Sequence, residues 1–381
     1  MIEFIFWVSV ALIVYAYAIY PIVVWGLSRL FGRLATSPAR AEDDLPSVSL
    51  LIAAYNEEQV IATRIENALA LDYPADRLEV VIASDGSSDA TARIVSAFED
   101  RRVRLLQSPL RRGKATVLNA AFRHVRGDIV LLSDANTFTD RSALRHIVRW
   151  FENPRIGIVC GQLVLTDPAT GRNVDGLYWR YETFLKRCEG RLGALLGANG
   201  AIYAIRRSSF AGIWNDTIVD DFVIPLVTRL RSGSEIVYDE DAVAYEETPH
   251  DFSTEFSRRS RIGAGGFQSI IRLRGLLNPN QGWTAFTFFS HKVLRWLCPF
   301  LLIAAFVTNL ALINVPLYQL TLTVQVLGYG LALLGLATGT RAGFRPLRLA
   351  TMFTAMNAAL LVGFWRWASG GQQGIWQRTA R

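Results

Sequence analysis

The sequence predicts an α/β domain built on a largely parallel sheet and flanked by membrane-spanning helices. From residue 48 onward, strand-like apolar runs alternate with helical ones, a pattern typical of parallel sheets with right-handed crossovers. The 381-residue chain is also 51% hydrophobic and only 19% charged. Because that composition is too apolar for an ordinary soluble domain, it indicates membrane segments in addition.

Acidic turns follow three of the predicted strands. Runs of strand length occupy residues 48–53, 78–84 and 128–133. They lead into Tyr-Asn-Glu at 55–57, Asp-Gly-Ser at 85–87 and Asp-Ala-Asn at 134–136. Open α/β sheets bind ligands at the carboxyl ends of their strands, so these turns are expected to line one crevice. Carboxylates gathered there suit a base, a ribose and a metal-bridged diphosphate, which indicates a nucleotide-sugar site.

The remaining elements follow from the same periodicity. Further strands are predicted at residues 103–107, 156–159 and 201–205. Helices are predicted at residues 57–71, 89–98, 114–125, 142–151, 178–192 and 221–231. The helix expected at 252–273 is basic and amphipathic, with five arginines between 258 and 274, and should lie along the membrane surface.

Four apolar stretches are candidates for crossing a membrane, which takes about 20 residues. They occupy residues 4–27, 297–315, 317–338 and 349–364, the last being the shortest. The first has no basic region before it and carries Glu3, so it is expected to be an uncleaved anchor rather than a signal peptide. Arg29, Arg33 and Arg40 follow it, which by the positive-inside rule puts residues 29–290 in the cytoplasm.

The expected organisation has six parts. They are an anchor at 1–28, a polar linker at 29–46, the α/β domain at 47–250, interfacial helices at 251–292, about three membrane helices at 293–367 and a tail at 368–381.

Charge and cysteine content exclude other classes. The net charge is +7, but no block of Lys and Arg with interleaved aromatics indicates nucleic-acid binding. Anionic lipid head groups and sugar diphosphates account for the charge more simply. Cys160, Cys188 and Cys298 have neither zinc-like spacing nor a disulfide framework, and the four histidines are scattered. We therefore expect reduced thiols and no histidine metal cluster.

With these motifs in order, the chain resembles the membrane-bound family 2 glycosyltransferases, which include the cellulose, hyaluronan and poly-N-acetylglucosamine synthases. The resemblance covers residues 47 to about 270. It implies a Rossmann-like GT-A domain that transfers a sugar, with inversion, from a nucleotide diphosphate donor, expected to be UDP-linked. It also implies a membrane-associated acceptor, polyprenyl-linked or polysaccharide, and a place in the bacterial inner membrane with the domain in the cytoplasm.

The resemblance assigns the donor-binding residues. Ala54, Tyr55 and Glu57 match the segment that frames the base and ribose. Asp85 matches the carboxylate that hydrogen-bonds the base, and Lys114 lies where a basic residue approaches the diphosphate. Each also has an ordinary structural interpretation: Asp85 as a turn residue, and Lys114 as an exposed lysine at a helix start.

The resemblance also assigns metal and catalytic residues. Asp134 and Asn136 occupy the Asp-x-Asp position that holds Mg²⁺ or Mn²⁺, and the amide of Asn136 replaces a carboxylate there. Asp220 and Asp221 match the later acidic pair, whose second member is the general base; one of them is expected to be a plain helix cap. The turn at 197–200 resembles the one beneath the acceptor sugar.

Arg258 and Arg261 align with the Gln-x-x-Arg-Trp helix and are expected to face the diphosphate; the alternative is a lipid-facing basic stripe. Ile262 replaces the Trp that supports the growing chain in processive synthases. For that reason, and because four membrane segments are few for a secretion channel, we favour single or limited addition over a processive, secreting synthase.

A different class stays open as an alternative: an inactive membrane scaffold that recruits other polysaccharide-synthesis proteins. The presence of Asp85, Asp134 and Asp221 argues against it.

Overall fold

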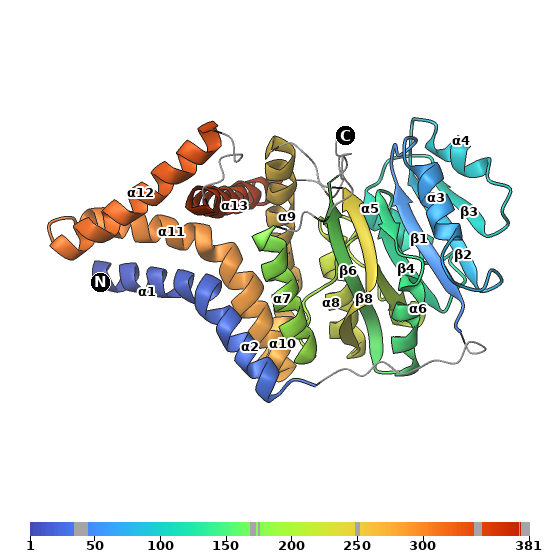
Figure 1. Cartoon of the computed structure of the whole chain (residues 1–381), viewed down its shortest axis with the longest axis horizontal. Helices are drawn as coiled ribbons and strands as arrows, with labels where there is room; N and C mark the ends of the chain where they lie inside the picture. The colour runs from blue at the N-terminus through green and yellow to red at the C-terminus, as the bar shows by residue number, and fades with distance from the viewer. Residues whose placement is uncertain are drawn as a thin grey trace. The chain divides into compact units, whose positions relative to one another are not determined.

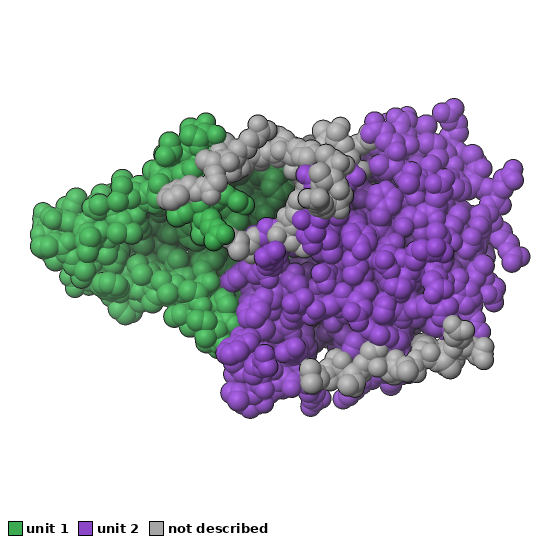
Figure 2. Space-filling view, viewed as in Figure 1, with its two compact units in different colours: residues 1–23, 251–272, 288–372 green, residues 24–250, 273–287, 373–381 purple. Residues whose placement is uncertain are grey.

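The structure is a computed structural model that describes residues 1–33, 45–167, 173, 176–247, 252–338, 345–372 and 374. Most of the predicted linker and most of the predicted tail fall outside these residues. The chain divides into two compact units (Figure 2). The first consists of Met1–Val23, Asp251–Arg272 and Phe288–Gln372, and the second of Val24–His250, Leu273–Thr287 and Gln373–Arg381.

The second unit contains an eight-stranded sheet in the order β3-β2-β1-β4-β7-β6-β8-β5 (Figure 1). The strands are β1 (Val48–Ala54), β2 (Leu78–Asp85), β3 (Val103–Ser108), β4 (Ile129–Asp134), β5 (Thr137–Thr139), β6 (Ile156–Thr166), β7 (Tyr203–Arg206) and β8 (Glu235–Glu247). The half from β3 to β4 is parallel, as predicted. The other half is mixed, because β7 runs antiparallel to β4 and β6, and β5 antiparallel to β8. The predicted α/β class is thus confirmed.

Helices cover both faces of the parallel half. On one face, Leu50 and Ile52 of β1 pack in a common core with α3 (Ile61–Leu69) and α6 (Ala143–Val148). On the other face lies α5 (Lys114–Ala121). Every residue of β1 is buried and all except Ser49 are apolar, which is typical of a central parallel strand.

The sequence did not predict β8, although it is 13 residues long. Its middle reads Asp-Glu-Asp, a run that argues against a buried strand. In the structure Asp239 is nonetheless only 3% exposed, because its carboxylate accepts hydrogen bonds from Trp150 Nε1 at 2.6 Å and Arg149 Nη2 at 3.0 Å. Partners distant in the sequence therefore make an acidic strand compatible with the core.

The other helices of the second unit include α4 (Thr91–Ser96), α7 (Leu177–Arg191) and α8 (Asp220–Ser232). Asp220 and Asp221 open α8, where the helix dipole favours negative charge. Gly233, in the left-handed conformation with φ of 68°, ends it.

The described chain has four helical stretches long and apolar enough to cross a membrane: Ile2–Leu30, Trp283–Ala311, Pro316–Thr338 and Arg345–Ala368. They contain α1 (Ile2–Val14), α2 (Tyr20–Leu30), α11 (Leu294–Ala311), α12 (Pro316–Thr338) and α13 (Arg345–Ala368). Each overlaps one of the four predicted stretches. The second and fourth begin earlier than predicted, because the helices continue through polar residues before the apolar run.

Within the first unit, α9 (Phe252–Arg272) packs closely on α13. A Cβ added to Gly363 would lie 2.5 Å from the carbonyl oxygen of Ser260, and one added to Gly263 would lie 3.2 Å from Cα of Leu360. Phe267 packs edge-to-face against Phe364 of α13, with 5.0 Å between the two ring centroids. One side of α9 is therefore occupied by another helix. Its predicted place along the membrane surface stays a prediction.

Candidate active site

The first two acidic turns are joined by hydrogen bonds. Asn56 adopts a left-handed conformation with φ of 55°. Its side-chain Oδ1 accepts a bond of 2.8 Å from the backbone N–H of Ser88, and its own N–H donates to Ser87 Oγ at 3.1 Å. The N–H of Glu57 donates to Thr91 Oγ1 at 2.8 Å. These bonds hold residues 57–60 out of the helix, so α3 begins at Ile61 rather than at the predicted 57.

Asp85 joins the second turn to the loop that precedes α5. Its side chain is fully buried, and its two carboxylate oxygens accept bonds from the N–H groups of Arg112 at 2.7 Å and Gly113 at 2.9 Å. The approach is close, because a Cβ on Gly86 would lie 2.6 Å from the backbone nitrogen of Arg111. Asp85 thus anchors the loop before α5, and its contact with a base stays a prediction.

Tyr55 follows β1 at the carboxyl edge of the sheet, and an arginine side chain packs on its ring. The Arg111 guanidinium lies 3.9 Å from the ring centroid, a cation–π contact. Ala54, by contrast, is fully buried at the end of β1, so its side chain belongs to the core. Arg111 was not predicted as a site residue from the sequence, although it is the first residue of the Arg-Arg-Gly-Lys run that contains Lys114.

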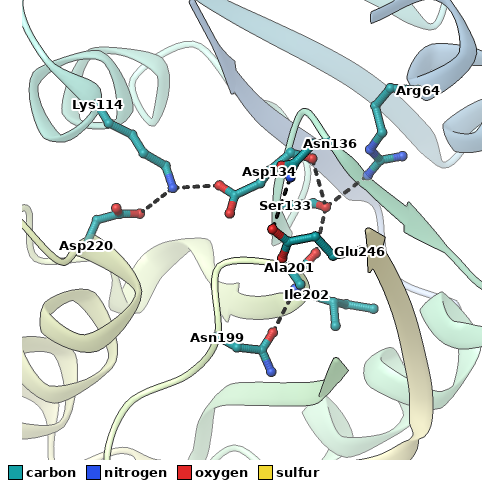
Figure 3. Close-up of polar contacts among 10 residues, drawn as sticks. All are labelled: Arg64, Lys114, Ser133, Asp134, Asn136, Asn199, Ala201, Ile202, Asp220 and Glu246. Atoms are coloured by element: carbon teal, nitrogen blue, oxygen red, sulfur yellow. Dashed lines mark hydrogen bonds and ion pairs between the residues drawn. The ribbon is translucent and has the colours of Figure 1, made fainter. Parts of the chain in front are cut away.

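Three elements bring Lys114, Asp134 and Asp220 together (Figure 3). The Lys114 ammonium at the start of α5 lies 2.7 Å from Asp134 Oδ1 at the end of β4 and 3.1 Å from Asp220 Oδ2 at the start of α8. Burial opposes the charge on Lys114, but the carboxylates of Asp134, Asp220 and Asp221 outweigh it and raise the pKa of Lys114. The lysine is therefore a permanent cation between two carboxylates rather than an exposed helix-start residue.

The turn at 197–200 lies against this cluster. Gly200 leaves room for the Asp134 carboxylate there, because a Cβ would lie 2.6 Å from Oδ2 of Asp134. The N–H of Ala198 donates to the carbonyl oxygen of Asp221 at 3.0 Å. Asn199 is buried and binds inward, donating to the carbonyl oxygen of Gly161 at 2.8 Å. The turn thus couples Asp134 to the start of α8.

Asn136 is held by a residue that the sequence analysis did not select. Its Nδ2 donates to Glu246 Oε1 of β8 at 3.1 Å (Figure 3). Glu246 could not be selected from the sequence, because β8 was not predicted. That strand brings Glu246 beside the Asp-Ala-Asn turn. Among the described residues, no three His, Cys, Asp or Glu side chains gather closely enough to hold a metal by themselves.

Arg64 places a buried positive charge behind the turn. It is fully buried in α3, and its two terminal nitrogens donate to Asn67 Oδ1 and Ser133 Oγ, both at 3.0 Å. Ser133 in turn donates to the carbonyl oxygen of Ala201 at 2.7 Å. Burial lowers the pKa of Arg64 to about 10, while Asp134 acts in the opposite direction. The sequence did contain an indication of this role, because Arg64 lies on the apolar face of a predicted helix.

Arg258 and Arg261 lie on α9, in the first unit. Within that helix, Glu255 pairs with the neighbouring Arg259, with 2.6 Å between its Oε1 and the arginine Nε. The role of Arg258 and Arg261 at a diphosphate stays a prediction.

Comparison with known proteins shows which family the sheet domain matches. Residues 49–214, which include Tyr55, Asp85, Lys114 and Asp134, match the model of glycosyl transferase family 2. These residues form a family 2 glycosyltransferase domain. The resemblance inferred from the motifs is thereby confirmed, and the domain is of the glycosyltransferase class.

Curated relatives of the glycosyltransferase domain are named as synthases of poly-β-1,6-N-acetyl-D-glucosamine. The chain is 28% identical over 243 residues to the poly-β-1,6-N-acetyl-D-glucosamine synthase of Staphylococcus aureus strain COL, covering 60% of this chain and 57% of that protein. The synthase of Staphylococcus epidermidis is 26% identical over 255 residues, covering 64% and 60%. The chain thus spans less than two thirds of the length of these relatives.

A solved structure supports the fold of the glycosyltransferase domain. It is a mannosyltransferase from Pyrobaculum calidifontis in complex with GDP-Man and Mn²⁺, with a TM-score of 0.74 and 22% identity. The match covers 98% of this chain and 100% of that one. The GT-A fold implied by the sequence motifs is confirmed.

Proposed function

We propose that this protein is an inverting glycosyltransferase of exopolysaccharide or glycolipid synthesis. It moves a sugar from a nucleoside diphosphate donor to a membrane-associated acceptor. The observation that carries the proposal is the cluster of Lys114, Asp134 and Asp220 at the carboxyl edge of the sheet. A cation between carboxylates, beside the topological switch between β1 and β4, suits a diphosphate bridged to the protein by a metal.

The residues at this edge fit a hard divalent cation. Asp134 offers a carboxylate with a side chain 35% exposed, and Asn136 adds an amide oxygen beside it. Since Mg²⁺ and Mn²⁺ sites of this kind take one or two protein ligands and complete their shell with water and substrate phosphates, a cluster of three acidic side chains is not required. When bound, the cation would neutralise charge on the departing diphosphate. The Mn²⁺ bound to the mannosyltransferase supports this assignment without deciding between the two metals.

The protein's own groups would carry out one direct displacement. The acceptor hydroxyl oxygen bonds to the anomeric carbon, its proton goes to a carboxylate, and the nucleoside diphosphate leaves with the electron pair of the broken bond. We assign the base to Asp221, the second member of the acidic pair, as the resemblance to the family implies; the carboxylate of Asp220 binds Lys114. Lys114 lies where it can stabilise the growing charge of the leaving diphosphate.

The donor is best sought among UDP- and GDP-sugars. The N-acetylglucosamine polymer made by the curated relatives favours UDP-N-acetylglucosamine, whereas the solved mannosyltransferase binds GDP-Man. The test is a panel of UDP- and GDP-sugars with full-length, detergent-solubilised protein, in which release of the nucleoside diphosphate is measured with and without lipid extract. Asp134→Ala serves as the blank. If no donor gives release above that blank, the inactive scaffold becomes the better account.

We further propose single or limited addition to a lipid-linked acceptor. The supporting observation is Ile262 on α9, which is 39% exposed and offers a sugar no aromatic face. The second candidate, a processive synthase, is supported by the names of the curated relatives. Sizing of radiolabelled product decides between them: short products throughout are expected, and high polymer at early times without short intermediates would support the processive synthase.

The four membrane-length helical stretches support an integral membrane location. We propose the bacterial inner membrane, with the glycosyltransferase domain on the cytoplasmic side, where nucleotide sugars are available. Cysteine labelling at Cys-substituted Arg29 and Val315 tests this orientation, because the two positions should react from opposite sides of sealed vesicles.

A further inference from the structure

A small cavity lies beside the Lys114–Asp134–Asp220 cluster. Its volume is about 10 Å³, and Lys114, Asp134, Gly200, Tyr203 and Asp220 contribute to its lining. That volume corresponds to a single water molecule. Four of these five residues already belong to the site described above. Tyr203, the first residue of β7, does not.

Tyr203 lines this cavity from the core of the sheet, and its hydroxyl oxygen Oη is a buried polar atom. The residue is 1% exposed, and its Oη forms no hydrogen bond with any residue that the structure describes. Buried hydroxyl groups are nearly always satisfied by protein or by ordered water, so this atom needs an explanation. Burial raises the pKa of Tyr203, and the carboxylates of Asp220, Asp221 and Asp134 raise it further. Because the phenol stays protonated, it can act as a donor.

We propose that Tyr203 is a positioning residue of the transferase, donating through one ordered water in this cavity to the carboxylate of Asp220. The water would have Tyr203 Oη as its donor and the oxygens of Asp220 and Asp134 as acceptors, which are enough polar partners for a buried water. The proposal rests on the proposed function and extends it to a residue that neither the sequence motifs nor the diphosphate site assigns.

Tyr203 would act through Asp220 on Lys114. A fixed Asp220 carboxylate keeps the ammonium at a defined point between α5 and β4, 3.1 Å from its own oxygen. Without the water link, Asp220 can rotate and Lys114 follows it. The ammonium itself is retained, so binding of the donor in the ground state is preserved. Stabilisation of the leaving diphosphate in the transition state, which depends on the position of the ammonium, is reduced.

The test compares Tyr203→Phe with Tyr73→Phe in the full-length protein. Each change removes one hydroxyl from a buried ring of the second unit. Tyr73 is 8% exposed and donates to the carbonyl oxygen of Pro46 at 2.6 Å, away from the carboxylate cluster. For Tyr203→Phe we expect kcat to fall by about tenfold, as for loss of one hydrogen bond to a charged network, with donor KM unchanged within about twofold. Tyr73→Phe should leave kcat unchanged even where it lowers Tm.

Thermal unfolding gives a second measurement with a defined sign. If water satisfies the hydroxyl, Tyr203→Phe removes a favourable bond and Tm falls. If the hydroxyl is an unsatisfied polar group, the same change removes a penalty and Tm rises. An unchanged kcat or a raised Tm in Tyr203→Phe overturns the proposal. Failure of the wild-type protein to transfer any sugar would instead contradict the proposed function, and Tyr203 would then be judged by the sign of the Tm shift alone.

Discussion

The Lys114 ammonium lies 2.7 Å from Oδ1 of Asp134, the same carboxylate that we propose as a ligand of the divalent cation. A lysine and a divalent cation repel each other, so each would weaken the binding of the other to the Asp134 carboxylate. A bound diphosphate removes the conflict, because it offers Lys114 other oxygens. Metal and donor are therefore expected to bind cooperatively, with Lys114 as the link between them.

Replacing Lys114 with Met should accordingly strengthen metal binding in the absence of donor. The change removes a competing positive charge, and we expect the Kd for Mn²⁺ to fall by about fivefold or more, as for loss of a close like-charge contact. The binding of donor should weaken in the same variant. Electron paramagnetic resonance of free Mn²⁺ measures the first effect, and titration calorimetry with a nucleoside diphosphate measures the second.

Arg102→Met is the matched control for Lys114→Met. It also removes one positive charge, but Arg102 pairs with Asp100 at the start of β3, 2.7 Å between Nη2 and Oδ2. Its Kd for Mn²⁺ should equal that of the wild type. Equal affinities in Lys114→Met and wild type would show that Lys114 does not compete with the cation.

Gly200→Ala should impair the site while leaving the fold intact. The new methyl group would lie 2.6 Å from Oδ2 of Asp134, so the carboxylate must move. Displacements of about 1 Å can cost on the order of 100-fold in rate, and we expect at least a tenfold loss of kcat together with weaker Mn²⁺ binding. Gly190→Ala is the control, because its Cβ would meet Tyr238 at an ordinary 3.5 Å. Wild-type kinetics in Gly200→Ala would contradict the proposed role of Asp134.

Asp221→Asn should lower kcat by about 10²- to 10⁴-fold with little change in donor affinity, because a general base acts on the acceptor proton in the transition state. Asp220→Asn should behave differently. It removes a negative charge beside Lys114 and should change the affinity for the diphosphate as well. Steady-state kinetics with varied donor separates the two, and the assignment is reversed if Asp220→Asn shows the pure kcat defect.

Removal of the metal should abolish transfer. We expect no turnover in excess EDTA, restoration by Mn²⁺ or Mg²⁺, and no restoration in Asp134→Ala, whose circular dichroism should match that of the wild type. The physical reason is that charge on the leaving diphosphate would then be left to Lys114 alone. Full turnover of the metal-depleted wild-type enzyme would exclude a metal-dependent mechanism.

The sequence predicted the parts of the fold that depend on local patterns. Strands β1, β2 and β4 are buried apolar runs, so both their existence and the position of the acidic turns at their ends could be inferred. The mixed half of the sheet could not, because its pairing depends on distant partners. Asp239 of β8 needs Trp150 and Arg149, 89 and 90 residues away in the chain, to be tolerated in the interior.

The candidate site divides in the same way. Three of the predicted site residues lie at the ends of helices or strands, where charged residues are easily recognised in a sequence. They are Lys114, Asp134 and Asp220, and the structure brings them together. Tyr203 and Glu246 lie within strands and look like ordinary strand residues until the sheet places them beside the acidic turns. Arg64 was visible only as one cation on an apolar helix face, with no indication that Ser133 would accept its hydrogen bond.

The contact between α9 and α13 has a mechanical meaning. At Gly263 and Gly363 the two backbones approach so closely that a side chain at either position would collide with the other helix. The pair should therefore move as one stiff rod. A displacement of α13 would then be transmitted to α9 and to the arginines that α9 carries at residues 258–261.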